Sequence, residues 1–439
     1  MYALPPGLVP AIVRIVELDF DVLVVGGGIA GCAAALAAAA AGRRVGLVRA
    51  APGATALVAG GWAGPLPEPL GAALARAGMP FEPAPSPLPH PTGRLDGYAL
   101  AAPAQRAATP LGGALVCGIS GLAGFPASAL ARAWGARSAV MAGAVVLDAG
   151  PIPRGGWSPA SLAARLEREP GPLAESLAGA VRRVGAARVV FPAVLGVERV
   201  DAVRAILEDA AGVPVGEALG TPPSLPGWRL DRALARALGE AGVAVVAGRV
   251  VDRVTEGPRL KQVLVRSAHG TAPRGMPDGT EPIDADRDGS TYAIGSGGAS
   301  HGETGTVVNP GNPGDTVRIT ARSFVLATGK YLAGGIRAED RFLEPALGCP
   351  VWVEYLGSTF GAPDPLALTH PDREADQPLL RAGVRTDDAG RPVDRRGDVV
   401  YENVRVAGTV RSGIDAAAPG LGHAAADGWR AGELAAEDV

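Results

Sequence analysis

A short apolar run followed by three spaced glycines constrains the fold of this chain more than any other feature. Residues 20–25 read FDVLVV, and Gly26, Gly28 and Gly31 follow at the spacing GxGxxG before an Ala-rich stretch. One glycine permits a tight turn from strand to helix, the next lets a phosphate approach bare backbone, and the third lets the helix lie close to the sheet. Residues 44–48 then supply a second apolar strand. The pattern predicts an α/β fold that binds a dinucleotide at the helix N-terminus.

The same stretch resembles a membrane span in length and composition, because Asp21 is the only charged residue between Phe20 and Gly42. Three consecutive glycines would weaken a lone spanning helix, and the run divides into strand, turn and helix. Residues 8–16 are also apolar, but Arg14 interrupts them and no cleavage site follows. We therefore expect a cytoplasmic protein that reaches the inner face of the cell membrane at most through a partner protein.

The last residue of the second strand departs from the usual pattern. Arg49 stands where an acidic side chain commonly accepts the ribose hydroxyls of a dinucleotide. Three interpretations stay open. Arg49 contacts a 2′-phosphate, which would indicate NADP; it lies against the adenine of a flavin dinucleotide; or the ribose is simply bound less tightly.

Charge and cysteine usage exclude several classes of function. The 439 residues carry a formal charge of −3, so a nucleic-acid partner is not expected. Cys32, Cys117 and Cys349 are too widely spaced for a disulfide framework or for a zinc or iron–sulfur site, and we expect buried core residues. Residues 284–289 resemble a calcium loop without the later Glu, so no metal site is predicted.

Two glycine-rich stretches favour a flavin over a nicotinamide. An apolar strand ends in Ala327, Thr328 and Gly329, small residues that let a second loop pass close to a cofactor. Gly60 and Gly61, in a loop that follows the second strand, can supply backbone amides beside a flavin ring. Each stretch alone is an ordinary glycine-rich loop, and their order along the chain gives them weight.

A second strand, turn and helix near the C-terminus strengthens the flavin interpretation. Gly408 occupies the turn, and Gly420 and Gly422 lie where an Ala-rich helix begins. The N-terminus of that helix can face the pyrimidine side of an isoalloxazine and stabilise negative charge there. Val251, on the strand pair predicted after the long helix near residue 230, is a further candidate contact.

Proline, glycine and polar clusters indicate the remaining elements. Helices are expected at residues 125–140 and 158–169, a buried strand at 187–196, and a helix with two strands at 230–255. Residues 62–110 are rich in proline and predict an extended covering segment. Residues 268–316 are dominated by Gly, Pro, Asp and Ser, and predict a hairpin insertion or mobile loop.

These elements suggest a discontinuous flavin-binding domain and a cap that carries the substrate contacts. The flavin-binding domain is expected to combine residues 18–100, 226–330 and 383–439, with the polar insertion 268–316 inside it. The cap is expected to combine residues 101–225 and 331–382.

The order of the motifs resembles the flavoproteins with two dinucleotide-type folds that are related to fumarate reductase and aspartate oxidase. More narrowly, it resembles the B-subunit family of anaerobic glycerol-3-phosphate dehydrogenase. The most specific segments are TPPSLPGWRL at residues 221–230, AGGI at 333–336 and LEPALG at 343–348. The other resembling segments, of which the weakest are generic flavoprotein turns, are FDVLVVGGGIAG at 20–31, TPLGG at 109–113, GISGLAGFPA at 118–127, VVFPAVLG at 189–196, ATGK at 327–330, GVRTDDAGRP at 383–392 and the run from 406 to 428. The resemblance covers most of residues 20–432, without the insertion.

This resemblance implies a Rossmann-like flavoprotein fold and a role within a three-part complex. A partner dehydrogenase, the A component, would oxidise sn-glycerol 3-phosphate to dihydroxyacetone phosphate. An iron–sulfur protein, the C component, would hold the complex at the membrane and pass electrons to quinone. Family members also lack the acid at the Arg49 position. FAD is the expected cofactor, because FMN would leave the amides of residues 26–31 with little to bind, although FMN stays open.

No compact catalytic constellation stands out in the sequence. Oxidation of an alcohol needs a base, and a phosphate needs cationic anchors. His423 and Asp415 flank the start of the C-terminal helix, and Arg337 and Arg411 follow glycine-rich turns. Other titratable residues are expected at surface or structural positions, namely His90, His269, His301, His370 and the loop residue Glu344.

Three functions are therefore compatible with the sequence. The first is a flavin-bearing subunit whose partner oxidises the substrate. The second is a stand-alone FAD-dependent dehydrogenase or oxidase of a small hydroxy acid or phosphorylated alcohol. The third is a cofactor-free scaffold that binds partner subunits.

Overall fold

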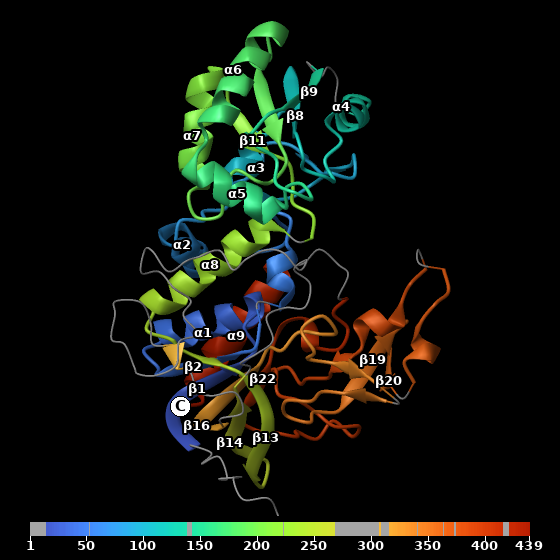
Figure 1. Cartoon of the computed structure of the whole chain (residues 1–439). Helices are drawn as coiled ribbons and strands as arrows, with labels where there is room; N and C mark the ends of the chain where they lie inside the picture. The colour runs from blue at the N-terminus through green and yellow to red at the C-terminus, as the bar shows by residue number, and fades with distance from the viewer. Residues whose placement is uncertain are drawn as a thin grey trace, which may run out of the picture.

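The computed structural model describes most of the chain: residues 15–51, 53–137, 143–222, 224–267, 307–308, 316–339, 341–362, 364–372, 375–415 and 421–439. Several predictions fall outside these residues: Gly420, His269, His301, the segment 284–289 that resembles a calcium loop, and most of the predicted insertion. The description below concerns the described residues, which form a large lower sheet, an upper lobe and a smaller β-rich unit (Figure 1).

Five parallel strands form the core of the large sheet. In chain order they are β1 (Ile15–Val25), β2 (Val45–Arg49), β12 (Ala244–Ala247), β16 (Thr316–Leu326) and β22 (Val404–Val406). Their spatial order is β12-β2-β1-β16-β22. This is the 3-2-1-4-5 order of doubly wound nucleotide-binding sheets, in which ligands bind beyond the carboxyl ends of the strands where the order reverses. The predicted Rossmann-like α/β fold is confirmed. The strand order reverses beside β1.

A hairpin extends the sheet past its parallel core. β13 (Arg249–Glu256) and β14 (Arg259–Arg266) pair antiparallel, and β14 pairs antiparallel with the first half of β16. At the opposite edge, β15 (Val307–Val308) pairs with β12. The last three residues of β16 pair with β22 instead, so the carboxyl end of β16 stays within the parallel arrangement.

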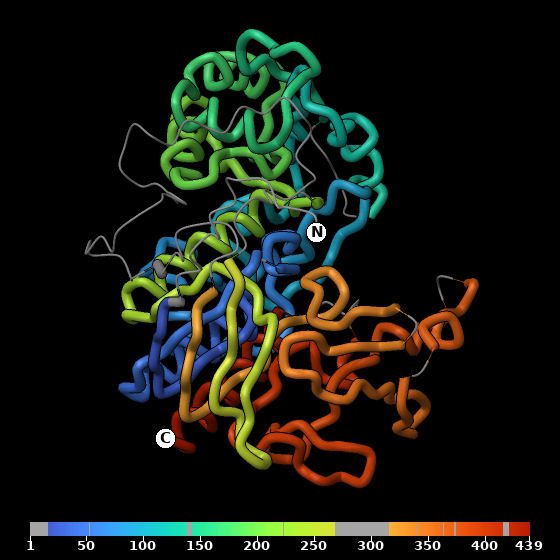
Figure 2. The backbone as a smooth tube through the Cα atoms, turned by 60° about the horizontal axis from the view of Figure 1, so that its bottom comes forward, coloured from blue at the N-terminus to red at the C-terminus, as the bar shows by residue number. Residues whose placement is uncertain are grey.

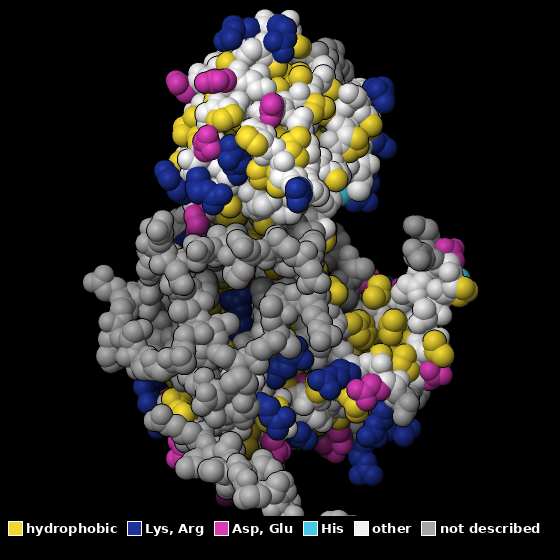
Figure 3. Space-filling view, viewed as in Figure 1, with side chains coloured by type: hydrophobic (Ala, Val, Ile, Leu, Met, Phe, Trp, Pro, Cys, Tyr) yellow, Lys and Arg dark blue, Asp and Glu magenta, His cyan; other side chains and the backbone are white. Residues whose placement is uncertain are grey.

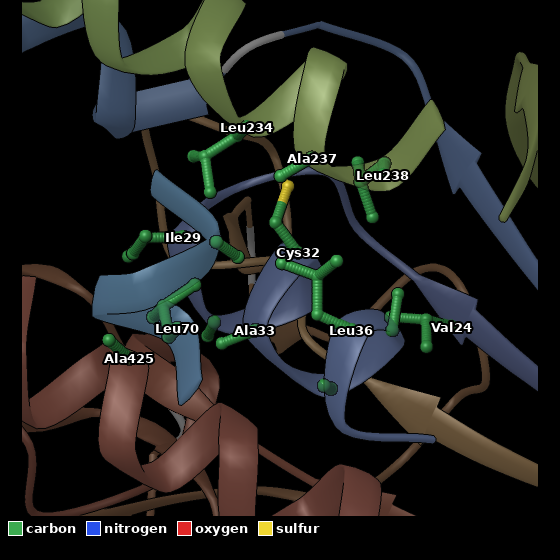
Figure 4. Close-up of a cluster of buried hydrophobic side chains, with 14 of the residues drawn as sticks. Val24, Ile29, Cys32, Ala33, Leu36, Leu70, Leu234, Ala237, Leu238 and Ala425 are labelled. Carbon is green, nitrogen blue, oxygen red and sulfur yellow. The ribbon is translucent and has the colours of Figure 1, made fainter. Parts of the chain in front are cut away.

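β1 is buried on both faces, which explains its continuous apolar sequence. Val22 and Val24 point into one core cluster, and Leu23 and Val25 into another. The first cluster contains side chains of four helices, α1 (Ile29–Ala40), α2 (Glu68–Arg76), α8 (Leu225–Glu240) and α9 (Leu421–Glu437). Figure 4 shows the Cys32 side chain of α1 pointing toward Ala237 of α8, with Leu36 beside Val24 in the same cluster. The stretch that resembled a membrane span is thus strand, turn and helix, as predicted.

Small residues let α1 and α9 pack closely. An added Cβ at Gly428 would overlap the backbone of Ala30, and one at Gly432 would overlap that of Ala34. The Ala-rich composition of α1 therefore serves its contact with α9, which brings the C-terminal helix against the first turn of α1. No described helix is long and apolar enough to cross a lipid bilayer.

The upper lobe is a second doubly wound unit, visible as the green part of Figures 1 and 2. Its parallel strands are β8 (Ala114–Ile119), β9 (Gly143–Leu147), β10 (Arg188–Phe191) and β11 (Val215–Glu217), in the order β11-β10-β8-β9. Its helices are α4 (Ala127–Gly135), α5 (Pro159–Arg168), α6 (Gly171–Val184) and α7 (Val200–Ala211). On the face drawn in Figure 3, acidic and basic side chains intermingle over this lobe.

A smaller β-rich unit covers the second face of the large sheet. It contains β17 (Arg337–Ala338), β18 (Phe342–Leu343), β19 (Val351–Tyr355), β20 (Ser358–Gly361), β21 (Gly383–Val384), η3 (Leu366–Leu368) and η4 (Pro378–Arg381). Its apolar side chains join the cluster beneath Leu23 and Val25. Residues 101–225 and 331–382, assigned to one cap from the sequence, thus contribute to different sheets.

The predicted helices and strands at 125–140, 158–169, 187–196 and 230–255 are confirmed by α4, α5, β10, α8, β12 and β13. The prediction of an extended segment at 62–110 is wrong in part, because it contains α2 (Glu68–Arg76) and α3 (Pro103–Ala107). Pro69 and Pro103 occupy the first turns of these helices, where proline is tolerated. Short strands complete this segment: β3 (Gly61–Trp62), β4 (Glu82–Pro83), β5 (Leu88–Pro89), β6 (Leu95–Asp96) and β7 (Leu100–Ala101).

Two predictions about individual residues are also confirmed. Cys32, Cys117 and Cys349 are buried and not disulfide-bonded. The Glu344 carboxylate positions a loop, because it accepts hydrogen bonds from the backbone amides of residues 346, 347 and 349.

Candidate flavin-binding site

The glycine turn between β1 and α1 is shaped by close backbone contacts on one side and open space on the other. Gly26 has a φ of +119°, and an added Cβ there would overlap the carbonyl group of Ala327. A Cβ on Gly31 would overlap the carbonyl oxygen of Gly26. Gly28 differs, since a Cβ there would meet only the Thr55 hydroxyl, at 3.6 Å. The backbone at Gly28 is therefore the one that a phosphate group can approach.

A loop after β2 organises the start of α1. Thr55 lies in η1 (Gly53–Leu57), is buried, and accepts a hydrogen bond from the Ile29 amide at 2.8 Å through its hydroxyl. This contact satisfies one of the orphan amides at the helix N-terminus. The remaining first-turn amides and the helix dipole make the turn suited to a diphosphate.

The carboxyl ends of three strands meet around the first turn of α1. The Ala327 amide donates to the Val25 carbonyl at 2.8 Å, and the Ala407 amide donates to the Leu326 carbonyl at 2.9 Å. Gly408, in η5 (Gly408–Val410) and with a φ of +75°, could not carry a Cβ because it would lie 2.6 Å from the Cβ of Ala30. The predicted turns at residues 26–31, 327–329 and 408 are thus brought together.

Thr328 carries a polar atom that the described protein leaves unsatisfied. Its hydroxyl oxygen is buried and has no hydrogen-bond partner among the described residues. A Cβ on Gly335 would lie 2.6 Å from that oxygen, so the following turn also passes close by. Buried polar atoms are rarely left unpaired, and a polar cofactor group beside Thr328 would satisfy this one. Together with the open backbone at Gly28, this residue set fits a bound dinucleotide.

Arg49 is held against the glycine turn by an ion pair that the sequence did not reveal. Its aliphatic stem packs over Gly27, where a Cβ would lie 2.6 Å from the Arg49 Cδ. Its guanidinium donates to the carboxylate of Asp231, from the second turn of α8. Both side chains are largely buried, with 13% and 18% of their surfaces exposed. Burial raises the pKa of Asp231, and the neighbouring Arg49 opposes this shift.

Three other predicted cofactor contacts, Gly60, Gly61 and Gly422, face protein groups. The space beside Gly60 is filled by the side chain of Gln105, and that beside Gly61 by the ring of Tyr98. The Gly422 amide, at the start of α9, donates to the Ala63 carbonyl at 2.9 Å. Val251 lies on β13 and is 44% exposed.

The candidate catalytic residue Arg411 forms an ion pair with Asp427. Its guanidinium pairs with the carboxylate of Asp427, from the second turn of α9, and donates to the Thr386 hydroxyl at 3.2 Å. The same Asp427 carboxylate accepts the Gly408 amide at 2.6 Å. Asp427 therefore fixes the second glycine turn to α9.

The remaining candidates lie apart from that ion pair. Arg337 is exposed on the short strand β17. His423 is exposed in the first turn of α9, and its ring would contact a Cβ on Gly64 at 3.2 Å. Asp415 follows the Gly413 turn and interacts electrostatically with Lys330. His370 is exposed in a loop, as predicted, where its backbone amide donates to the side chain of Gln377.

Lys330 is a titratable group that sequence reasoning missed. It directly follows Gly329, is 4% exposed, and donates through its Nζ to the Leu380 carbonyl at 2.6 Å and to that of Ile414. Burial lowers its pKa from 10.5 to about 7, with Asp415 raising it and Arg381 lowering it. A signal was present in the sequence, because Lys330 is one of two lysines in a chain that otherwise uses arginine. No comparable feature of the sequence pointed to Asp231 or Asp427 as residues of the site.

A cavity of about 320 Å³ lies where the upper lobe meets α8, and its lining includes Met79, Gln105, Arg199, Arg229 and Arg236. None of its lining residues belongs to the glycine turns, so it is separate from the site described above.

The chain matches known flavoproteins. The family model for an FAD binding domain matches residues 21–76. The probable anaerobic glycerol-3-phosphate dehydrogenase B subunit of Halobacterium salinarum is 31% identical over 256 residues, covering 57% of this chain and 48% of the relative. The B subunit of the anaerobic glycerol-3-phosphate dehydrogenase of Yersinia pestis is 26% identical over 238 residues, covering 53% of this chain and 42% of the relative. The chain thus spans about half the length of the curated relatives it matches.

Solved structures of flavoproteins also cover most of the chain at low similarity. The 3-ketosteroid-Δ4-(5α)-dehydrogenase of Rhodococcus jostii RHA1 has a TM-score of 0.36 at 14% identity, covering 97% of this chain and 99% of that one. A flavocytochrome c3 fumarate reductase has a TM-score of 0.36 at 13% identity, covering 96% and 78%. These scores are too low to support an argument about function.

The sequence matches agree with the glycine turns and the strand order. FAD, predicted over FMN from the diphosphate-type turn, is confirmed as the cofactor of this fold. Residues 21–76 thus match an FAD binding domain, and the chain is similar over about half its length to B subunits of anaerobic glycerol-3-phosphate dehydrogenase.

Proposed function

We propose that this chain is the flavin-carrying B subunit of an anaerobic glycerol-3-phosphate:quinone dehydrogenase. The dehydrogenase partner, the A component, would oxidise sn-glycerol 3-phosphate. The iron–sulfur partner, the C component, would hold the complex at the inner face of the membrane and deliver electrons to quinone. The observation that carries the proposal is the meeting of the turns at Gly26, Ala327 and Gly408, in a chain whose curated relatives are named as this subunit.

The residues of the chain would hold FAD at three places. The amides from Gly26 to Gly28 and the start of α1 would bind the diphosphate, since Gly28 is open to approach. Thr328 would offer its unpaired hydroxyl to a polar group of the cofactor. Asp427 would keep the Gly408 turn in place by accepting its amide while pairing with Arg411. FAD would supply the capacity to accept a pair of electrons and to release them singly.

The arrangement of the candidate catalytic residues favours a role in electron transfer over substrate oxidation. Arg411 is neutralised by Asp427, so its charge is poorly placed to attract a phosphate. Arg337 lies exposed on β17, and His423 is exposed beside the loop that contains Gly64. Among the described residues, no hydrogen bond or ion pair links these three side chains. Among the residues that the structure describes, these three side chains therefore do not form one linked set that combines a base with a phosphate anchor.

An absorption spectrum of the purified protein, recorded before and after addition of glycerol 3-phosphate, tests this proposal. A flavin spectrum that glycerol 3-phosphate leaves unchanged, but bleaches once the partner proteins are added, is the expected result. Bleaching by the substrate without partners would support a stand-alone dehydrogenase instead. A colourless, folded protein that binds no added FAD would support the scaffold function and contradict the proposal.

A further inference from the structure

The ion pair between Arg49 and Asp231 lies at the end of β2, where a dinucleotide fold meets the ribose of its ligand. The acid that usually stands there is replaced by arginine. The stem of that arginine lies over Gly27 of the phosphate turn, and its guanidinium meets a carboxylate from a helix 182 residues later in the chain. A carboxylate is therefore present beside the turn, although it comes from α8 and not from β2.

The start of α8 is fixed against the same loop that shapes the phosphate turn. Ser224 caps the helix, accepting the Gly227 amide at 3.3 Å, and its hydroxyl donates to the carbonyl of Val58. Gly227 packs on Ala56, whose Cα would lie 3.0 Å from an added Cβ. Because Ala56 follows Thr55, which holds the Ile29 amide, α8 and α1 are tied to one short segment. The position of Asp231 relative to the turn is thus determined by packing on both helices.

The charges at this point discriminate between possible ligands. An arginine alone would attract the 2′-phosphate of NADP, but the Asp231 carboxylate neutralises Arg49 and would repel a phosphate. Ribose hydroxyls are neutral hydrogen-bond donors, and a partly desolvated carboxylate gains by accepting them. The hydrogen bond from Arg49 is accepted by the Oδ1 of Asp231. The Oδ2 of Asp231 can therefore accept a hydrogen bond from a ribose hydroxyl.

We propose that Asp231 binds the adenosine ribose of FAD, replacing from α8 the acid that β2 lacks, and that Arg49 holds its carboxylate in position. The inference rests on FAD as the cofactor of this site. Three roles for Arg49 were left open by the sequence. The proposed role of Asp231 excludes a contact between Arg49 and a 2′-phosphate, and it gives Arg49 a positioning role beside the adenosine.

Binding of two flavins to the cofactor-free protein tests this role. FAD is compared with an analogue that lacks only the 2′-hydroxyl of the adenosine ribose, and dissociation constants are measured by quenching of flavin fluorescence. The wild-type protein is expected to prefer FAD by about tenfold or more, the range of a hydrogen bond to a charged group. Asp231→Asn is expected to lose that preference because it binds FAD more weakly while its affinity for the analogue stays unchanged. Glu240→Gln, the same charge change at the exposed end of α8, is expected to keep it.

An unchanged preference in Asp231→Asn, or no preference in the wild type, would overturn the proposal. If Asp231→Asn does not fold, Arg49→Gln tests the proposal instead. Arg49→Gln is expected to weaken the binding of FAD and to leave the binding of the analogue unchanged. An equal loss of affinity for both ligands would refute the role of Asp231 in binding the ribose. A folded wild-type protein that binds neither flavin would contradict the FAD site itself, which is a separate failure.

Discussion

At the scale of single residues, a glycine and a lysine show how little freedom the site allows. Gly26 has a backbone conformation that other residues avoid and also faces the carbonyl group of Ala327. Lys330, a few residues beyond the end of β16, keeps an amine inside the protein by giving its hydrogens to two carbonyls. The conformation of each of these two residues is fixed by the groups packed around it.

We expect Gly26→Ala to abolish FAD binding and to lower the free energy of unfolding by about 2 kcal/mol or more, because strain and steric overlap add. Gly42→Ala is the matched control, since Gly42 also has a positive φ, of +76°, but has open space around it. It should cost about 1 kcal/mol and leave FAD binding intact. Urea denaturation and flavin content of the purified variants measure both effects. Normal flavin content in Gly26→Ala would contradict the close approach of the two turns.

Lys330 predicts a specific dependence of stability on pH. Its pKa is lowered from 10.5 to about 7 by burial, so between these values the unfolded chain binds more protons than the folded protein. The free energy of unfolding should therefore gain a contribution that rises with pH in this window, approaching about 1.4 kcal/mol per pH unit. Below pH 7 both states are protonated and the contribution is flat.

Lys330→Met should remove this contribution, whereas Lys261→Met should retain it because the Lys261 side chain is 46% exposed. Urea denaturation at several pH values from 7 to 10 compares the slopes. Equal slopes in the wild type and Lys330→Met would show that the amine titrates normally in the folded protein.

At the scale of secondary structure, the contact between α1 and α9 determines whether the two glycine turns meet. Gly428 and Gly432 bring α9 against Ala30 and Ala34, and Asp427, on the same helix, accepts the Gly408 amide. The glycines that would weaken an isolated helix thus strengthen a helix–helix contact. This is why the glycine content of α9 could not be interpreted from helix propensity alone.

Two glycine-to-alanine changes in helices should therefore have opposite effects. Gly432→Ala should lower the free energy of unfolding by about 1–3 kcal/mol, because the added methyl overlaps the backbone of Ala34. Gly179→Ala, in α6, should raise it by about 0.5–1 kcal/mol, because the nearest atom is the Arg183 Nη1 at 3.5 Å. Thermal and urea unfolding measure both variants. A stabilising effect of Gly432→Ala would contradict the close packing of α1 and α9.

Local sequence was sufficient for the elements that carry their own signals. The GxGxxG spacing, the buried strands and the helix capped by Ser158 were predictable from short-range rules. The helix expected from residue 230 begins earlier than predicted, at Leu225, with Ser224 as its cap. α2 was missed because its prolines resemble a loop signal, although Pro69 occupies a position that helices accept. Asp231 and Asp427 were missed for a different reason. Their partners lie 182 and 16 residues away, and only the packing of α8 and α9 brings them together.

At the scale of the whole molecule, one buried ion pair joins the upper lobe to the lower sheet. Glu217, at the end of β11, is fully buried and accepts two hydrogen bonds from Arg229 of α8, at 2.5 and 2.9 Å. The carboxylate also accepts the Leu195 amide at 2.6 Å and the side-chain amide of Gln105 at 3.1 Å. Arg229 adds two bonds to the Gly196 carbonyl. The lobes therefore meet through a buried polar network in which the Glu217 carboxylate and the Arg229 guanidinium are paired by hydrogen bonds and opposite charge.

We expect Glu217→Gln to lower the free energy of unfolding by about 3–5 kcal/mol, because it leaves the Arg229 charge buried without a counter-charge. Glu256→Gln, which removes an exposed partner of Lys261, should leave the free energy of unfolding nearly unchanged. Urea denaturation followed by circular dichroism compares the two variants. Similar small effects for both would show that the lobes do not depend on this pair.

The order of the strands in the large sheet has a consequence for how the protein acquires its flavin during synthesis. β1 and β2 are translated early, but β22 and α9, which complete the turn at Gly408, follow residue 403. A ribosome that has made only the first three parallel strands, β1, β2 and β12, carries a nascent chain that still lacks the turns at Ala327 and Gly408 beside the phosphate turn. Cofactor loading is consequently a late event, and truncated translation products would compete poorly for FAD even though they contain the complete glycine fingerprint.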